Sequence, residues 1–208
     1  MGAVRDPGSQ AATRNPFAIP QGALGGLAGR IMARGNEEQQ HEVLGLFDVR
    51  PGQRVLEVGH GPGHLVRLLL KRTGAGLVAG VDPSQTMLAQ AQRANRVAVR
   101  AGRADLRQGT ADRLPFDDAS FDHVVSVNSC QIWPDLTAGL REAHRVLRPG
   151  GTIVLAVHSR SAPSRMARRI GLCEEDAAHI SRTLARLFTD VASRDLVHSV
   201  AFTAVRGR

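Results

Sequence analysis

Two patterns of apolar residues alternate along residues 54–158. One consists of short unbroken runs, and the other of apolar residues spaced three or four positions apart. The short runs predict strands at 54–58, 104–108, 123–127 and 152–157, with a further strand ending at Asp82. The wider spacing predicts helices at 64–72, 85–96 and 135–147. Strands that alternate with helices in this way indicate an α/β fold with a doubly wound, mostly parallel, Rossmann-like sheet.

The N-terminal part of the chain has a different pattern. Residues 1–20 are rich in Gly, Pro, Ser, Asn and Arg, and we expect a mobile tail there. Leu24, Leu27 and Ile31 have the spacing of one helix face, and Asn36 is placed to cap a second helix. We expect the helices within 21–48 to cover the binding cleft of a single domain that spans 21–208.

The C-terminal fifty residues complete the predicted domain. The polar stretch Ser159–Ser164 is typical of a loop, and residues 174–187 have helical spacing. Two apolar stretches follow, at 191–197 and 200–205. Because they are separated by so few residues, we expect an antiparallel pair of strands at the C-terminal end.

A glycine-rich turn after the first strand is the strongest candidate for chemistry. Glu57 is followed by glycines at three alternate positions, Gly59, Gly61 and Gly63, just before a predicted helix. Glycines let the backbone turn sharply and let a ligand approach closely, and the amides at a helix start attract anionic groups. A dinucleotide-binding turn would need a glycine where His64 stands, so a nicotinamide-dependent oxidoreductase is disfavoured.

A second signal lies about 20 residues past the glycine turn, where Asp82 ends the next predicted strand. A carboxylate at this place is suited to a bidentate hydrogen bond with a ribose diol. The alternative is an ordinary strand–helix–strand unit with a cluster of turn glycines and an Asp that caps a helix. The two signals together favour a nucleoside-binding site.

Composition narrows the class of protein. The chain of 208 residues has a net charge of +8, carried by arginine with Lys71 as the only lysine. No basic block or basic–aromatic alternation accompanies this charge, so a nucleic-acid partner is disfavoured. No apolar run approaches the ~18 residues of a membrane span, and we expect no membrane partner. With two cysteines and no signal-peptide pattern, we expect a cytoplasmic location.

The motifs together resemble those of the class I S-adenosylmethionine (SAM)-dependent methyltransferases, in the small-molecule branch that includes ubiquinone- and menaquinone-biosynthesis enzymes. The resemblance covers about Gln39 to His158. Four segments carry it: Val55–Gly63, Gly80–Leu88, Gly109–Asp122 and Arg145–Gly151.

The resemblance implies a role for each part of the cofactor site. The glycine turn would hold the methionine end of SAM, Asp82 the ribose, and residues 83–84 and 110–111 the adenine, with 128–129 near the transferable methyl group. Many relatives have an acid at the place of Thr110, and here its hydroxyl or the Ala111 amide would replace that contact. The implied cofactor-binding residues are Glu57, Gly59, His60, Gly61, Gly63, Asp82, Pro83, Ser84, Thr110, Ala111, Asn128 and Ser129.

We expect the methyl acceptor to be a small organic molecule that reacts through O, N or C by in-line displacement, leaving S-adenosylhomocysteine. Such a reaction needs a general base only if the acceptor arrives protonated. Among the histidines near the predicted mouth, which include His60 and His64, His158 is the candidate base because it follows strand 152–157. Gln131 and Trp133 are candidates for the acceptor-pocket wall, although Trp133 is equally suited to the core. The remaining histidines lack metal-ligand spacing, so we expect no metal.

Two alternatives stay open within the methyltransferase class. The net charge would suit an RNA methyltransferase, but Asn128-Ser129-Cys130-Gln131 replaces the Asn/Asp-Pro-Pro-aromatic motif of enzymes that methylate base amino groups. The second alternative is a protein that binds SAM without catalysing transfer. It stays open because little sequence follows His158 that could form a lid over a methyl acceptor. The sequence identifies neither the acceptor nor the oligomeric state.

Overall fold

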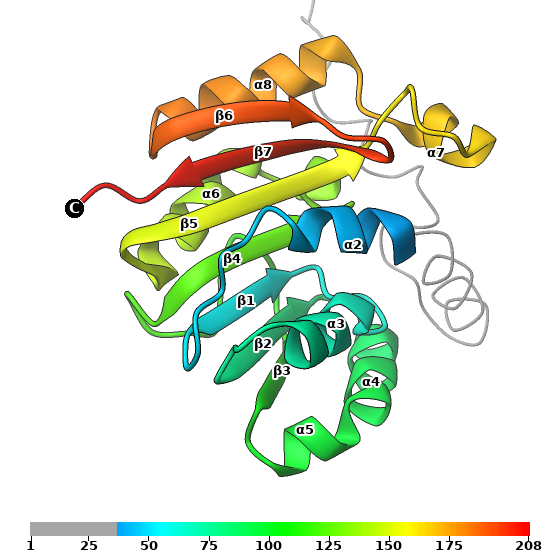
Figure 1. Cartoon of the computed structure of the whole chain (residues 1–208). Coiled ribbons are helices and arrows are strands. Elements are labelled where there is room, and N and C mark those ends of the chain that lie inside the picture. Colours follow the sequence, from blue (N-terminus) through cyan, green and yellow to red (C-terminus); the bar gives the residue numbers. More distant parts are fainter. Residues whose placement is uncertain (1–36) are drawn as a thin grey trace, which may run out of the picture.

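The computed structural model describes residues 37–208, which form one seven-stranded sheet with helices on both faces (Figure 1). The strand order is β3-β2-β1-β4-β5-β7-β6. The strands are β1 (Arg54–Val58), β2 (Leu77–Asp82), β3 (Ala104–Gln108), β4 (Phe121–Val127), β5 (Leu147–His158), β6 (Thr189–Asp195) and β7 (Ser199–Val205). The helices are α2 (Glu37–Leu44), α3 (His64–Arg72), α4 (Gln85–Ala94), α5 (Arg96–Arg100), η2 (Cys130–Ile132), α6 (Leu136–Val146), α7 (Arg165–Ile170) and α8 (Glu174–Ala185).

The predicted doubly wound, mostly parallel sheet is confirmed. Strands β1 to β5 run parallel, and β7 pairs antiparallel with both β5 and β6. The expected antiparallel pair at the C-terminal end is therefore present. Because β1 lies between β2 and β4, the ends of these three strands meet at one edge of the sheet.

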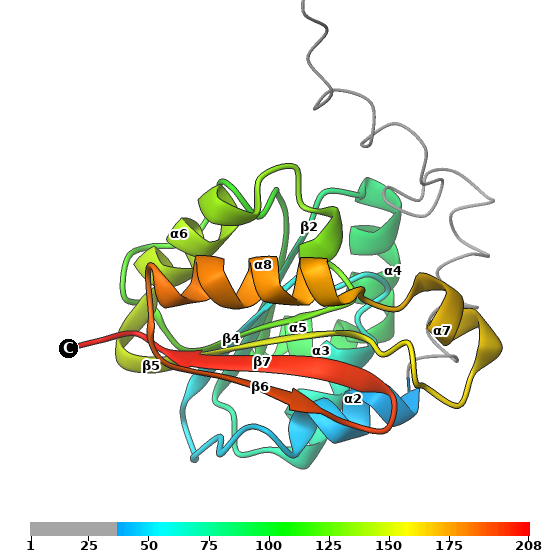
Figure 2. The ribbon, with the colours of Figure 1, turned by 90° about the horizontal axis from the view of Figure 1, so that it is seen from above.

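Helices lie on both faces of the sheet (Figure 2), and each face has its own apolar core. On one face α6 and α8 cover the sheet, with Leu140 and Leu184 fully buried. On the other face α2, α3 and α4 cover it, with Val43 and Leu65 fully buried. Strand residues buried on both sides explain the unbroken apolar runs of the sequence, because a parallel sheet has no solvent-facing side.

Several boundaries differ from the predicted ones. The helix predicted at 85–96 ends at Ala94 because the Asn95 side chain donates to the carbonyls of Ala91 and Gly63, both at 3.0 Å, and α5 then begins separately. Strand β4 begins at Phe121, and β6 lies two residues earlier than predicted. Helix α7, capped by the Ser164 hydroxyl, was not predicted.

The start of β5 is the largest difference from the predicted boundaries. The predicted helix at 135–147 and strand at 152–157 leave residues 148–151 as a connecting turn, whereas the strand begins at Leu147. Main-chain hydrogen bonds from Gly150 N to Arg206 O and from Arg206 N to Gly151 O, both 2.8 Å, continue the sheet through this segment. The tail at 1–20, the helix expected at 21–34 and the Asn36 cap lie outside the described residues. Within 37–208, no helix is long and apolar enough to cross a bilayer.

Candidate functional site

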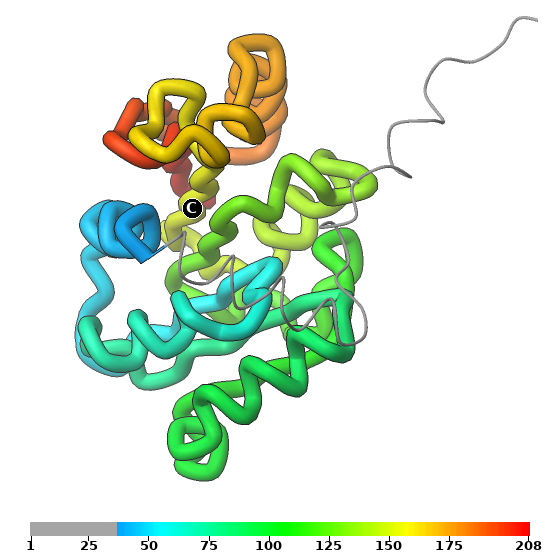
Figure 3. Tube along the Cα trace, turned by 90° about the vertical axis from the view of Figure 1, so that its right-hand side faces the viewer, coloured from blue at the N-terminus to red at the C-terminus, as the bar shows by residue number. Residues whose placement is uncertain are grey.

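The predicted site residues converge at the carboxyl ends of β1, β2, β4 and β5, the edge that faces the viewer in Figure 3. The glycine turn follows β1, Asp82 ends β2, Asn128 follows β4 and His158 ends β5. Ligands of open α/β sheets bind at this edge, where neighbouring loops diverge. The fold therefore brings together segments that are up to about one hundred residues apart in the sequence.

Three glycines of the turn have left-handed backbone conformations, with φ of 82° at Gly59, 50° at Gly61 and 78° at Gly63. Gly59 also has no room for a side chain. A Cβ atom there would lie 2.1 Å from Ser129 Oγ and 2.5 Å from Ser129 Cβ. The turn is thus packed directly against the first residues after β4, and this close approach requires glycine.

Glu57 places a buried carboxyl group beneath the glycine turn. Glu57 is 3% exposed, and its Oε2 atom has no hydrogen-bond partner. Burial and the nearby Asp82 carboxylate raise the pKa of Glu57 well above its usual range. A buried carboxyl with an unused oxygen is suited to receive a cationic or hydrogen-bond-donating group of a ligand.

Asp82 links the first two motifs. Its Oδ2 accepts from the Gly61 amide and its Oδ1 from the Ser84 amide, both at 2.9 Å. The Ser84 hydroxyl in turn accepts from the Met87 amide at 3.3 Å and caps α4. Each carboxylate oxygen can accept a second hydrogen bond, so this arrangement fixes the carboxylate while it keeps acceptor capacity for a diol.

His60 lies inside the turn, where it packs against the backbone of Gly80. A Cβ atom at Gly80 would be 2.9 Å from the ring. The ring is 3% exposed, its Nδ1 is 2.7 Å from the Gly61 carbonyl, and Nε2 has no partner. Because a carbonyl only accepts, Nδ1 is the protonated nitrogen. Burial lowers the pKa of His60, so the ring is neutral near pH 7.

A buried polar cluster joins α2 to the ends of β4 and β5. The side-chain amides of Gln39 and Asn128 bond to each other twice, at 2.7 and 3.2 Å, and Gln39 is 1% exposed. Asn128, with φ of 53°, also accepts from the His158 amide at 3.0 Å. Its Nδ2 lies 3.2 Å from His158 Nε2.

These contacts determine the proton positions in the cluster. The His158 backbone N–H can only donate, so the atom that accepts from it must be the oxygen of Asn128. The Asn128 nitrogen then faces His158 Nε2, which must accept, and the ring proton lies on Nδ1. Burial lowers the pKa of His158, so the neutral ring is favoured.

Ser129 and Trp133 form the remaining contact at this edge. The Trp133 indole Nε1 donates to Ser129 Oγ at 2.9 Å. The ring packs on α6, where a Cβ atom at Gly139 would lie 2.4 Å from it. Gln131 is exposed on η2. The Trp133 side chain therefore packs against a helix and also bonds to a predicted cofactor residue.

The segment predicted to lie beside the adenine is anchored from α6. Arg145 donates to the carbonyls of Leu114 and Phe116, at 3.0 and 2.8 Å, and is paired with Glu142 at 2.7 Å. Glu142 in turn accepts from the Leu114 amide at 2.8 Å. Within this segment Thr110 is exposed, Ala111 is 8% exposed and Pro83 lies nearby, its carbonyl accepting from Gln108 at 3.1 Å.

Sequence reasoning did not identify Gln39 or the Arg145–Glu142 pair as site residues. Gln39 and its partner Asn128 are 89 residues apart, so no local sequence pattern indicates the contact. Arg145 begins the segment Arg145–Gly151, which carries the resemblance, but nothing in that segment indicates that its side chain holds the 114–116 backbone.

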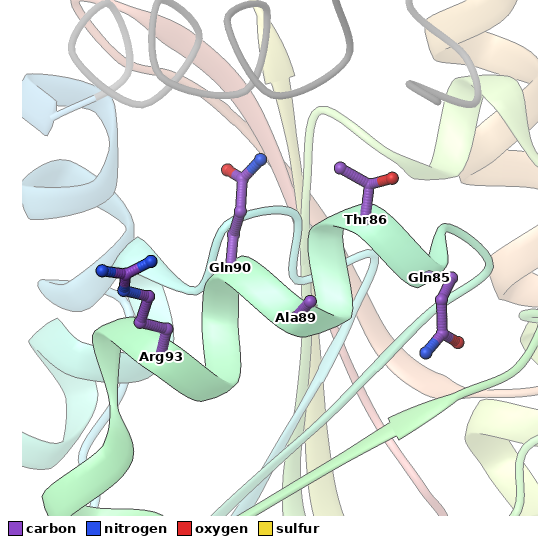
Figure 4. Close-up of a pocket in the computed structure, with 5 residues that line it drawn as sticks. All are labelled: Gln85, Thr86, Ala89, Gln90 and Arg93. Atoms are coloured by element: carbon purple, nitrogen blue, oxygen red, sulfur yellow. The ribbon is translucent and has the colours of Figure 1, made fainter. Parts of the chain in front are cut away.

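A shallow depression lies on α4, beginning directly after the cap residue Ser84 (Figure 4). It is lined by Gln85, Thr86, Ala89, Gln90 and Arg93. In Figure 4 the Thr86 and Gln90 side chains extend from the same side of the helix. Within 37–208, no group of three or more His, Cys, Asp or Glu residues is arranged to hold a metal ion.

Residues 56–155 match the family model described as a methyltransferase domain. A protein of Bacillus subtilis named as the uncharacterized methyltransferase YdaC is 35% identical over 136 residues, which cover 65% of this chain and 73% of that protein. The chain therefore belongs to the methyltransferase family. Within that family, its fold and motifs make it a class I SAM-dependent methyltransferase.

Other relatives agree with this assignment. Demethylmenaquinone methyltransferase of Bacillus cereus is 32% identical over 114 residues, which cover 54% of this chain and about half, 48%, of that protein. A SAM-dependent methyltransferase structure from Aquifex aeolicus has a TM-score of 0.66 at 17% identity and covers 80% of this chain and 89% of its own. Phosphoethanolamine N-methyltransferase 2 of Haemonchus contortus, solved with S-adenosylhomocysteine, also has a TM-score of 0.66, at 21% identity, covering 83% of this chain and 53% of its own. At such identities the structural likeness concerns the fold.

The groups at this edge fit the cofactor that the family requires. SAM has a cationic ammonium, a carboxylate, a ribose diol and a sulfonium methyl group. Glu57 has a buried oxygen without a partner, Asp82 has acceptor capacity for a diol, and a Cβ atom at Gly61 would meet nothing within 4 Å, so the turn has open space beside its backbone. The residues present are therefore complementary to SAM in charge and in hydrogen bonding.

Proposed function

We propose that this protein transfers the methyl group of SAM to an O, N or C nucleophile of a small organic acceptor by in-line displacement. The observation that carries the proposal is the convergence of Glu57, the Gly59–Gly63 turn and Asp82 at the edge reached by β4 and β5. The relatives named demethylmenaquinone methyltransferase support a small organic acceptor.

The proposed roles of the residues follow from their contacts. Glu57 and the amides of the glycine turn would bind the methionine end, and Asp82 would bind the ribose hydroxyls. The segment held by Arg145 would supply Thr110 and Ala111 beside the adenine. The sulfonium supplies an already activated methyl group, so the protein's main task is to hold the acceptor in line and to exclude water.

His158 is the proposed base for an acceptor that arrives protonated. Its lowered pKa keeps the ring unprotonated near neutral pH, as a base requires. Its Nε2 lone pair accepts from Asn128 in this structure, so proton transfer to Nε2 requires that hydrogen bond to open. We therefore expect Asn128 and His158 to act as a unit on the acceptor side.

The decisive experiment measures binding of S-adenosylhomocysteine by calorimetry to the wild type and to Asp82→Asn. Loss of a charge-assisted hydrogen bond costs about 1.5–3 kcal/mol, so Kd is expected to rise roughly ten- to hundredfold. Asp112→Asn is the matched control, because Asp112 is exposed. An unchanged Kd in Asp82→Asn contradicts the site assignment.

A second measurement tests catalysis itself. The wild type, given SAM and a panel of small organic acceptors, is expected to release S-adenosylhomocysteine with at least one of them. Binding without turnover across a broad panel would instead favour the non-catalytic SAM-binding alternative. Turnover restricted to RNA, with binding that weakens steeply with salt, would favour the RNA methyltransferase alternative.

A further inference from the structure

Trp133 is the only tryptophan of the chain, and it lies between the glycine turn and α6. Its ring packs on Gly139, and its indole N–H donates to Ser129 Oγ at 2.9 Å. Packing on α6 accounts for the position of the ring. It does not account for the direction of the N–H, which points back toward the segment that follows β4.

The hydrogen-bonding chemistry of the indole and the hydroxyl determines which of the two groups donates. An indole N–H donates only, so the Ser129 oxygen must accept, and its own proton is left for another partner. Among residues 37–208, the Trp133 indole is the one hydrogen-bond partner of Ser129 Oγ, and the hydroxyl donates to none. Ser129 is only 9% exposed, so the unused donor lies in a largely water-free place.

The position of Ser129 identifies what this donor faces. Its Oγ lies 2.1 Å from the place that a Gly59 Cβ would occupy, so the hydroxyl is in contact with the glycine turn. That turn is the part of the site assigned to the methionine end of the cofactor. The methionine carboxylate is the strongest hydrogen-bond acceptor of that end.

We propose that Trp133 is a positioning residue, whose indole N–H orients the Ser129 hydroxyl as a hydrogen-bond donor to the methionine end of SAM. The proposal rests on the function proposed above and deepens it. Trp133 would then orient a ligand-binding hydroxyl, instead of serving only as pocket wall or core. Trp133 itself need not touch the ligand, because it acts through Ser129.

The test is a double-mutant cycle on the affinity for S-adenosylhomocysteine, measured by calorimetry. Trp133→Phe keeps an aromatic ring but removes the N–H donor and the second ring of the indole, whereas Ser129→Ala removes the hydroxyl. Each single variant is expected to weaken binding about three- to tenfold, the range of one neutral hydrogen bond. The double variant is expected to bind no more weakly than Ser129→Ala, because Trp133 acts only through that hydroxyl.

A matched control separates this role from a general loss of packing. Ser126→Ala removes a buried hydroxyl from β4 that has no hydrogen-bond partner, and the affinity is expected to stay unchanged. Trp133→Phe without a change in affinity overturns the proposal. Additive losses in the double variant also overturn it, since they would show that Trp133 acts without Ser129.

A spectroscopic measurement distinguishes this proposal from the one on which it rests. Because Trp133 is the only tryptophan, the tryptophan emission reports the surroundings of this one ring, which include the Ser129 hydroxyl. The emission of unliganded Ser129→Ala is expected to shift from that of the wild type, and no shift would contradict the contact. If the wild type fails to bind S-adenosylhomocysteine, the proposed function and the cofactor role of Ser129 both fail, while the emission still tests the Trp133–Ser129 bond.

Discussion

Substitution of Gly59 by alanine is expected to destabilise the protein more than the same change at Gly61. Both residues have positive φ, at 82° and 50°, and an L-residue in the left-handed region costs about 1–2 kcal/mol. At Gly61 nothing lies within 4 Å of the new Cβ, so the backbone cost stands alone. At Gly59 the Cβ would lie 2.1 Å from Ser129 Oγ, and one of the two groups must move.

The overlap at Gly59 adds the cost of overpacking, about 1–3 kcal/mol. The free energy of unfolding is therefore expected to fall by about 2–5 kcal/mol in Gly59→Ala and by about 1–2 kcal/mol in Gly61→Ala. Against a total stability of about 5–15 kcal/mol, the first loss is large and readily measured by urea unfolding.

A third variant isolates the overlap with Ser129. Ser129→Gly removes the Oγ and Cβ atoms, the two that would overlap with the new Cβ, so the combined variant Gly59→Ala/Ser129→Gly should keep only the backbone cost. The double-mutant cycle is expected to show a coupling of about 1–3 kcal/mol. Equal losses in the two alanine variants, or no recovery on removal of the Ser129 side chain, would refute the packing that we describe.

Two further predictions concern the thiols and the histidines. Burial raises the pKa of Cys130 to about 12. In the folded protein a thiol reagent should therefore modify Cys173 and leave Cys130 unmodified until the protein unfolds. Prompt modification of both cysteines would contradict the buried position of the Cys130 thiol. Burial lowers the pKa of His158 in the folded state, so unfolding takes up a proton as the pH falls below about 6.5, and stability should decrease there. His158→Gln should lose less stability between pH 7.5 and pH 5.5 than the wild type in urea unfolding, and an equal loss would contradict the assigned pKa direction.

The strands and helices whose bounds were predicted best are those with turn-forming residues close to their ends in the sequence. Strand β1 and helix α3 match their predicted ranges because a turn with Pro51 and Gly52 precedes the strand and three glycines separate it from the helix. Strand β3 also matches. Such signals depend only on neighbouring residues, so the sequence alone is enough to place them.

The boundaries and contacts that were missed depend on distant residues. The turn expected at 148–151 is part of β5 because Arg206, far along the chain, pairs with its backbone. The Gln39–Asn128 amide pair and the Trp133–Ser129 hydrogen bond become visible only when the fold brings their elements together. The motif residues could be assigned to one edge of the sheet, but the hydrogen bonds that orient them could not.

The hydrogen-bonding side chains of helix α2 have their partners much later in the chain, whereas its Val43 packs in the same apolar core as Leu65. Its Gln39 is bonded to Asn128, and its Glu42 accepts from the His198 amide and the Ser199 hydroxyl, contacts that span 89, 156 and 157 residues. During synthesis on the ribosome, this helix therefore emerges first among the described elements, but its Glu42 contacts cannot form until residues 198 and 199 have been made. A nascent chain stalled before residue 198 could hold this helix through Val43 and the Gln39–Asn128 pair, but not through Glu42.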